Sequence, residues 1–364
     1  MAELIVARAP TRIDFAGGTL DIPPLHLFHQ PAITINVAID LIAEVAVTRR
    51  PGRAIRLFAS DQGRQVAWPS REKITWTRYP FLELVARLIR SLAPDGGLDV
   101  RTACQAPAGA GTGGSSALAV ATAAALAAVA GRPLNRGSLI EHAKSIETQA
   151  IRVPTGYQDY YAAAYGGASS IEFGLTGIRR TAIAGKPFLA QLERHLLLLY
   201  LGKPRFSGAN NWDLFKRHME GDRRTLALFD ALQENALAMQ HAFQAQDLRG
   251  IARLLNRDWD TRRRALPTMS NPAIDRLIRA LRRAGALGAR VCGAGGGGCL
   301  ALIIEPEARA KLIAIAEAAG AKSLPSVINT RGLVVRRSKE SFQRSALSGQ
   351  QDKANREVMS ERSS

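Results

Sequence analysis

Cysteine is scarce in this chain of 364 residues, which contains only Cys104, Cys292 and Cys299. Their spacing fits neither a disulfide framework nor a motif of metal ligands. This excludes a small secreted domain held together by disulfides and suits a reducing compartment. We therefore expect a cytoplasmic protein.

Long hydrophobic runs are also missing. The most apolar run, residues 117–130, is mostly alanine and is shorter than the roughly 20 residues that a membrane-spanning helix needs. The first residues, Met-Ala-Glu-Leu, lack a basic region followed by an apolar one, so no secretory signal is evident. We expect no membrane association and interpret residues 117–130 as a buried helix.

Acidic residues are too few to balance the basic ones: 31 Asp and Glu stand against 49 Lys and Arg, for a formal net charge of +18. Such a charge raises the question of nucleic-acid binding, but no recognition motif and no interleaved aromatic residues accompany the arginines. The charge suits attraction of anionic substrates such as ATP and sugar phosphates. The second of two arginine clusters has helical spacing, which is typical of a solvated helix face. The clusters are Arg262, Arg263 and Arg264, then Arg276, Arg279, Arg282 and Arg283.

Two residue types are absent where common nucleotide-binding motifs need them. Gly109, Gly111 and Gly114 form a G-x-G-x-x-G pattern, but no acidic residue follows before Glu141, where a dinucleotide site needs one roughly 20 positions on. Ser115 follows Gly114 where a P-loop needs lysine. The turn therefore matches neither a dinucleotide-binding motif nor a P-loop.

What is present is a glycine-rich turn, residues 107–117, between a strand-like run at 98–106 and the alanine-rich run. Glycines allow the backbone N–H groups to approach an anion, and the following helix adds the positive end of its dipole. A flexible loop is the alternative. The predicted phosphate-binding residues are Pro107, Gly109, Ala110, Gly111, Thr112, Gly113, Gly114, Ser115 and Ser116.

The turn at 107–117 resembles the second motif of the galactokinase, homoserine kinase, mevalonate kinase and phosphomevalonate kinase (GHMP) superfamily. Residues 8–23 are similar to its first motif, in the version found in heptose-7-phosphate kinases and fucokinases, and residues 291–300 are similar to its third. The resemblance implies an ATP-dependent kinase. It also implies a nucleotide-binding N-terminal domain of the ribosomal S5 domain 2-like type and a ferredoxin-like C-terminal domain.

Periodicity predicts an α+β fold, with strands and helices alternating in both halves. We expect an N-terminal domain at 1–185, a C-terminal domain at 186–336 and a disordered tail at 337–364, which is polar and poor in apolar residues. The expected strands are 5–8, 32–48, 54–59, 98–106, 196–201, 290–304 interrupted by the glycine turn, one near Val327, and 333–335. The expected helices are 80–92, 115–130, 138–151, 209–220, 225–243, 272–284 and 307–319.

Phosphoryl transfer asks mainly for positioning and charge neutralisation. The resemblance places Asp159 as the general base, or as the charge that orients the acceptor hydroxyl. Arg12 would be the cation that partners Asp159, since a guanidinium keeps its charge and can form bidentate hydrogen bonds. A surface arginine is the alternative for Arg12.

The resemblance implies Mg²⁺ bound through Ser115 and Glu147. Glu147 falls on the apolar side of the helix expected at 138–151, and a surface or capping glutamate is the alternative. Hydroxyls at a helix start are ordinarily N-caps, so one of Ser115 and Ser116 could have that role. The choice of serine as metal ligand stays open.

The acceptor would be bound by Gly17, Gly18 and Asp21 of the first motif and supported by Gly295 of the third. Arg205 lies in a polar stretch suited to a second anion such as a sugar phosphate, although a plain loop explains the same residues.

The sequence therefore predicts an ATP- and Mg²⁺-dependent kinase for a sugar or sugar phosphate, with heptose 7-phosphate as the leading acceptor. Alternatives are a kinase for fucose or a polyol, and a regulatory protein that binds nucleotide or sugar without turnover. We expect no nucleic-acid partner and leave a homodimer open.

Overall fold

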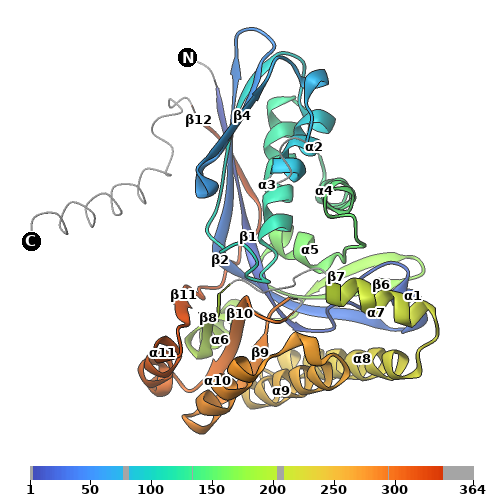
Figure 1. Ribbon diagram of the computed structural model, residues 1–364, viewed down its shortest axis with the longest axis vertical. Coiled ribbons are helices and arrows are strands. Elements are labelled where there is room, and N and C mark those ends of the chain that lie inside the picture. The colour runs from blue at the N-terminus through green and yellow to red at the C-terminus, as the bar shows by residue number, and fades with distance from the viewer. Residues whose placement is uncertain (1–2, 77–81, 133, 203–208, 294, 339–364) are drawn as a thin grey trace, which may run out of the picture.

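The computed structural model describes residues 3–76, 82–132, 134–202, 209–293 and 295–338. Two β-sheets with helices packed on them make up the chain (Figure 1), which confirms the predicted α+β class. Within the described residues, no helix combines the length and apolar character needed to cross a membrane.

The first sheet has eight strands and is built on two long ones, β1 (Leu4–Ala16) and β2 (Ala32–Arg50). β1 pairs along most of its length with β2, and its pairing register shifts at Pro10/Thr11 and at Asp14/Ala16. Such irregularities bend a strand and redirect its side chains. The remaining strands are β3 (Ile55–Ala59), β4 (Arg64–Trp68), β5 (Gly97–Cys104), β6 (Ala168–Gly174), β7 (Gly177–Ala182) and β12 (Val334–Ser338).

Helices cover one face of this sheet, with α3 (Gly114–Val129) at the centre (Figure 1). Twelve of its sixteen residues are buried, most of them alanine, because small side chains allow a helix to pack closely on every side. The buried helix predicted at 117–130 is confirmed. Around α3 lie α2 (Glu83–Leu92), α4 (Arg136–Ile151) and α5 (Gln158–Tyr165).

The second sheet is antiparallel, in the order β11-β8-β10-β9. Its chain path is strand, helices, two strands, helix and strand, which is the ferredoxin-like arrangement. Its strands are β8 (Leu196–Tyr200), β9 (Ala286–Val291), β10 (Cys299–Ile304) and β11 (Lys322–Leu324). The other helices are α1 (Leu25–Phe28), α6 (Lys186–His195), α7 (Ala209–Met219), α8 (Arg223–Gln244), α9 (Leu248–Ala265), α10 (Pro272–Arg283) and α11 (Arg309–Ala318).

A shared hydrophobic cluster joins the two halves. Ile13 and Phe15 of β1 pack in the same core as Phe243 of α8, with the two phenyl rings edge to face at 5.3 Å. The division at residue 185 stays a proposal, and the sheets themselves divide differently: β12 follows β11 in sequence but pairs with β1. The expected tail at 337–364 lies outside the described residues apart from its first two, which belong to β12.

Some elements differ from the sequence predictions. The strand expected at 5–8 runs from 4 to 16, because Pro10 and the polar residues after it hide the alternation. The strand expected near Val327 is wrong, since a single bridge between Ile39 and Ile328 stands there. The solvated arginine face on α10 is confirmed for Arg276, Arg279 and Arg283, which are exposed. Arg282 is half-buried instead, and its Nη2 donates to Oδ1 of Asn256 on α9 at 2.6 Å. The prediction gave no element at α5, α6, α9, β4, β6, β7 or β11.

Candidate active site

The glycine-rich turn leads directly into α3 and packs against the turn between β9 and β10. Gly111 and Gly113 have φ of 74° and 73°, which favours glycine. A Cβ on Gly111 would lie 2.5 Å from the carbonyl oxygen of Cys292, and one on Gly113 would lie 2.9 Å from Oδ2 of Asp159. Neither position has room for a side chain. The two predicted motif loops therefore meet, although they are far apart in sequence.

A cavity of about 550 Å³ opens beside these turns. Arg12, Ser115 and Asp159 line it together with both glycine turns, including Gly295. Thr112 and Ser116 are buried and do not line it. Apolar side chains of α2 and α3 complete the other end. The cavity thus combines two glycine turns, a cation and a carboxylate with an apolar wall.

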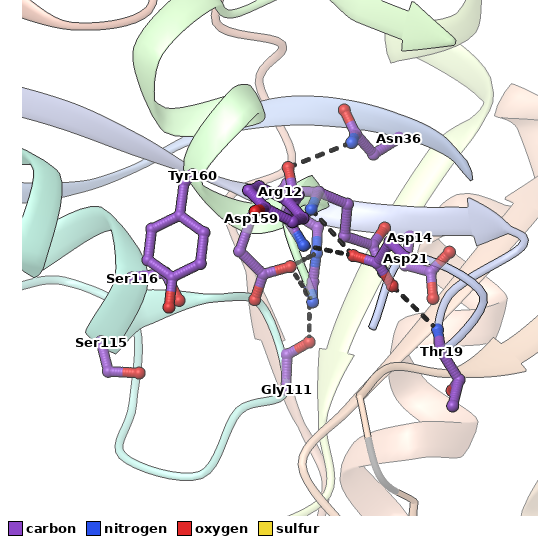
Figure 2. A network of polar contacts seen from close by, with 12 residues as sticks. Arg12, Asp14, Thr19, Asp21, Asn36, Gly111, Ser115, Ser116, Asp159 and Tyr160 are labelled. Carbon is purple, nitrogen blue, oxygen red and sulfur yellow. Dashed lines mark hydrogen bonds and ion pairs between the residues drawn. The ribbon is translucent and has the colours of Figure 1, made fainter. Parts of the chain in front are cut away.

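Arg12 connects the glycine-rich turn to Asp159. Its Nε lies 2.8 Å from Oδ1 of Asp159, and its Nη1 donates to the carbonyl oxygen of Gly111 at 2.6 Å (Figure 2). Arg12 is 6% exposed, so the surface alternative for it is wrong. Burial raises the pKa of Asp159, and the charge of Arg12 acts in the opposite direction. Arg12 uses Oδ1, while Oδ2 lies toward Gly113.

A second polar group forms where α3 begins. Gly113 is the N-cap, and neither of the two serines caps the helix. Both donate instead to the Glu147 carboxylate, Ser115 at 2.5 Å and Ser116 at 2.8 Å, and Tyr160 Oη donates to it at 2.7 Å. Glu147 is 3% exposed, so it is no surface glutamate, and burial raises its pKa.

Asp21 lies where α5 begins. Its carboxylate accepts the backbone N–H groups of Tyr157 at 2.7 Å, Gln158 at 2.9 Å and Thr19 at 3.1 Å. The first two N–H groups belong to the first turn of α5 and have no acceptor within the helix. The N-cap residue Tyr157 makes no side-chain cap, so Asp21 serves as the cap instead. Burial raises the pKa of Asp21 to about 6, although these hydrogen bonds oppose it.

Four buried charged residues that sequence reasoning missed lie behind the loop containing Gly17 and Gly18. Asp14 of β1 binds both terminal nitrogens of Arg290 at 3.2 and 2.5 Å. Arg290 Nε is 3.2 Å from Asp258, which also binds Arg262 Nε at 2.8 Å. Arg262 had been grouped with its basic neighbours in sequence. The available signal was helical spacing, since Asp258 and Arg262 share a face of α9 with Ile251 and Leu255.

Arg205 lies outside the described residues, so its predicted role in binding a second anion has no structural counterpart here. Asp21 lies on the side of the Arg12–Asp159 pair opposite Ser115 (Figure 2), and Gly17, Gly18 and Asp21 do not line the cavity. Arg12, Asp159 and most of the predicted phosphate-loop residues thus line one cavity, whereas Glu147 does not line it and accepts a hydrogen bond from Ser115, which does.

Comparison with known families finds a matching segment in each half of the chain. Residues 80–167 match the family model described as the GHMP kinases N terminal domain, and residues 239–322 match that described as GHMP kinases C terminal.

Individual relatives agree with these matches. The chain is 25% identical over 316 residues to D-glycero-alpha-D-manno-heptose 7-phosphate kinase of Campylobacter jejuni, covering 85% of this chain and 92% of that protein. Its fold is similar to that of a D-glycero-D-manno-heptose 1-phosphate kinase from Bacteroides thetaiotaomicron, with a TM-score of 0.74, 20% identity and coverage of 93% and 100%. Lactococcus lactis galactokinase, solved with galactose, gives a TM-score of 0.73 at 16% identity, with coverage of 91% and 95%.

Proposed function

Because this chain belongs to the GHMP kinases, we propose that it transfers the γ-phosphoryl group of ATP to a hydroxyl of a sugar or sugar phosphate. The observation that carries the proposal is the contact series from Gly111 through Arg12 to Asp159. It brings the glycine-rich turn, a buried cation and a carboxylate to one cavity, which supports an anion-binding role for the turn. These are the parts that phosphoryl transfer needs.

Asp159 is proposed to receive or orient the proton of the acceptor hydroxyl through Oδ2. Its raised pKa makes it a better proton acceptor than a solvated aspartate, and the positive charge of Arg12 favours its ionised form. The guanidinium of Arg12 also lies beside the phosphate loop and can stabilise charge that develops on the transferred group.

The chain's oxygen donors fit a Mg²⁺ ion bound to ATP. Such an ion takes one or two protein oxygens and completes its shell with phosphate and water. Ser115 lines the cavity and hydrogen-bonds to Glu147, so these two would hold it. The described residues contain no group of three or more His, Cys, Asp or Glu arranged around a metal, so phosphate oxygens would have to contribute. When bound, the ion would neutralise phosphate charge.

The acceptor is proposed to be a heptose 7-phosphate, since the kinase from Campylobacter jejuni that the chain resembles carries that name. Fucose and polyols are the competing acceptors. A cytoplasmic location is proposed from the three free cysteines, and cell fractionation tests it.

The test is ADP release from ATP and Mg²⁺ with a panel of sugars and sugar phosphates. Asp159→Asn keeps the shape of the side chain and removes its charge, so we expect turnover with one acceptor to fall at least about 100-fold. Arg264→Met, an exposed change on α9, is the control and should retain activity.

An ATP-induced rise in Tm without turnover on any acceptor would favour the regulatory alternative. Turnover that survives Asp159→Asn would remove Asp159 from the mechanism.

A further inference from the structure

Arg262 lies at the end of a buried series of ion pairs that runs from β1 through β9 to α9. Asp14, Arg290, Asp258 and Arg262 are each at most 4% exposed. Two carboxylates face two guanidinium groups, so the series has no net charge. Such a group is costly to bury and is strongly disrupted when one member is removed.

Arg262 donates hydrogen bonds to this series and to the loop at 17–21, where one acceptor is a backbone carbonyl and the other a side-chain hydroxyl. Its Nε binds Asp258, its Nη2 donates to the carbonyl oxygen of Gly18 at 2.6 Å, and its Nη1 lies 3.5 Å from Oγ1 of Thr19. The Arg262 side chain therefore contacts two successive loop residues, Gly18 and Thr19.

The loop is strained at the point where Arg262 holds it. Thr19 has φ of 86° and is 6% exposed. A β-branched residue rarely adopts positive φ, and such strain persists only where the surroundings enforce it. The hydrogen bonds from Arg262 to Gly18 and Thr19 are part of the surroundings that enforce this conformation.

From the loop the geometry continues to the proposed base. Thr19 donates its N–H to Asp21, Asp21 caps α5, and Asp159 lies in the first turn of α5. We propose that Arg262 is a positioning residue that holds the loop at 17–21 in its strained form, and thereby fixes the acceptor against Asp159. This inference rests on the proposed function only for its kinetic effect.

Because Arg262 and Arg290 come from α9 and β9, the packing of the second half of the chain sets the shape of a loop that belongs to the first. Direct recognition of the acceptor by Arg262 is the competing view. The guanidinium is 3% exposed and its three nitrogens already have partners, which speaks against that view.

The experiment compares Arg262→Met with Arg264→Met, a neighbour on α9 whose side chain donates to the carbonyl oxygen of Asp260 in its own helix. Hydrogen exchange is followed at residues 17–21, and KM is measured for acceptor and for ATP. We expect Arg262→Met to speed exchange and to raise the acceptor KM about tenfold, a ratio in the range that releasing one strained residue gives. The ATP KM should stay within about twofold, since the nucleotide cavity is not lined by this loop.

Thr19→Gly distinguishes a role of Arg262 in holding the loop from a role in binding the acceptor directly. Glycine adopts φ of 86° at no cost, so the loop no longer needs to be held. In the Arg262→Met background we expect Thr19→Gly to restore most of the acceptor KM and of the exchange protection. Arg262→Lys, which keeps the charge and can reach one oxygen, should lie between wild type and Arg262→Met.

Unchanged exchange and KM in Arg262→Met would overturn the proposal. A raised KM that Thr19→Gly does not restore would show direct contact with the acceptor instead. If Arg262→Met does not fold, Thr19→Gly with Arg262→Lys gives the same comparison. Exchange needs no turnover, so failure of the proposed kinase function would leave this result readable.

Discussion

At the scale of single residues, Asp21 carries opposing effects. Burial favours its protonated form, while three backbone N–H groups favour the carboxylate, and burial prevails to give a pKa of about 6. Its ordinary value is 3.8, so between pH 4 and 6 the folded chain binds a proton at Asp21 that the unfolded chain has released.

The folded state is therefore favoured at low pH and loses this contribution as the pH rises through 6. We expect the unfolding free energy of wild type, minus that of Asp21→Asn, to fall by up to about 3 kcal/mol between pH 4 and 7. Urea titrations over this range provide the measurement. Asp95→Asn, on an exposed side chain, is the matched control, and a flat difference for Asp21→Asn would contradict the prediction.

Arg12 and Asp159 could be singled out from the sequence because each lies in a stretch that resembles a family motif. Arg262 was not singled out, because it is one of three successive arginines. It differs from the other two only when the helix is drawn, where it lies on the buried face with Leu255 and Trp259. Asp14 lies in the same motif stretch as Arg12, two residues further along the strand, but the resemblance was not used to assign it a role.

At the scale of elements, the start of α3 distinguishes its two serines. Ser115 is exposed and lines the cavity, whereas Ser116 is 5% exposed and does not. Ser115→Ala should raise the Mg²⁺ concentration needed for half-maximal turnover by about tenfold, with little change in Tm.

Ser116→Ala should do the reverse, because it leaves a buried Glu147 oxygen short of a donor. We expect a loss of about 1–3 kcal/mol in stability and an unchanged Mg²⁺ requirement. Equal Mg²⁺ requirements in the two variants would remove Ser115 as the metal ligand. The sequence located this helix start well, since a glycine turn ahead of an alanine run is a strong local signal, but it could not show which serine faces inward.

At the scale of the whole molecule, the buried ion pair between Asp14 and Arg290 joins β1 to β9. Replacing either one by leucine strands a buried charge, and we expect each single change to cost about 3–5 kcal/mol. The double variant Asp14→Leu/Arg290→Leu leaves Asp258 paired with Arg262 and should cost clearly less than the sum. Urea denaturation of the four proteins gives the coupling, and strict additivity would mean that the pair does not act as a unit.

The α+β class and the chain order of most elements followed from periodicity and motif order. The pairing of β12 with β1 did not, because Leu4 lies opposite Ser338 and a contact across the whole chain leaves no local trace in the sequence.

That same pairing has a consequence during synthesis. At roughly 5–20 residues per second, a ribosome needs about 15–70 s to add the chain between β1 and β12. Throughout this time β1 has β2 on one side and an open row of N–H and C=O groups on the other, a template that any extended segment can join. Of the described strands, the one that closes this edge is the last to be translated.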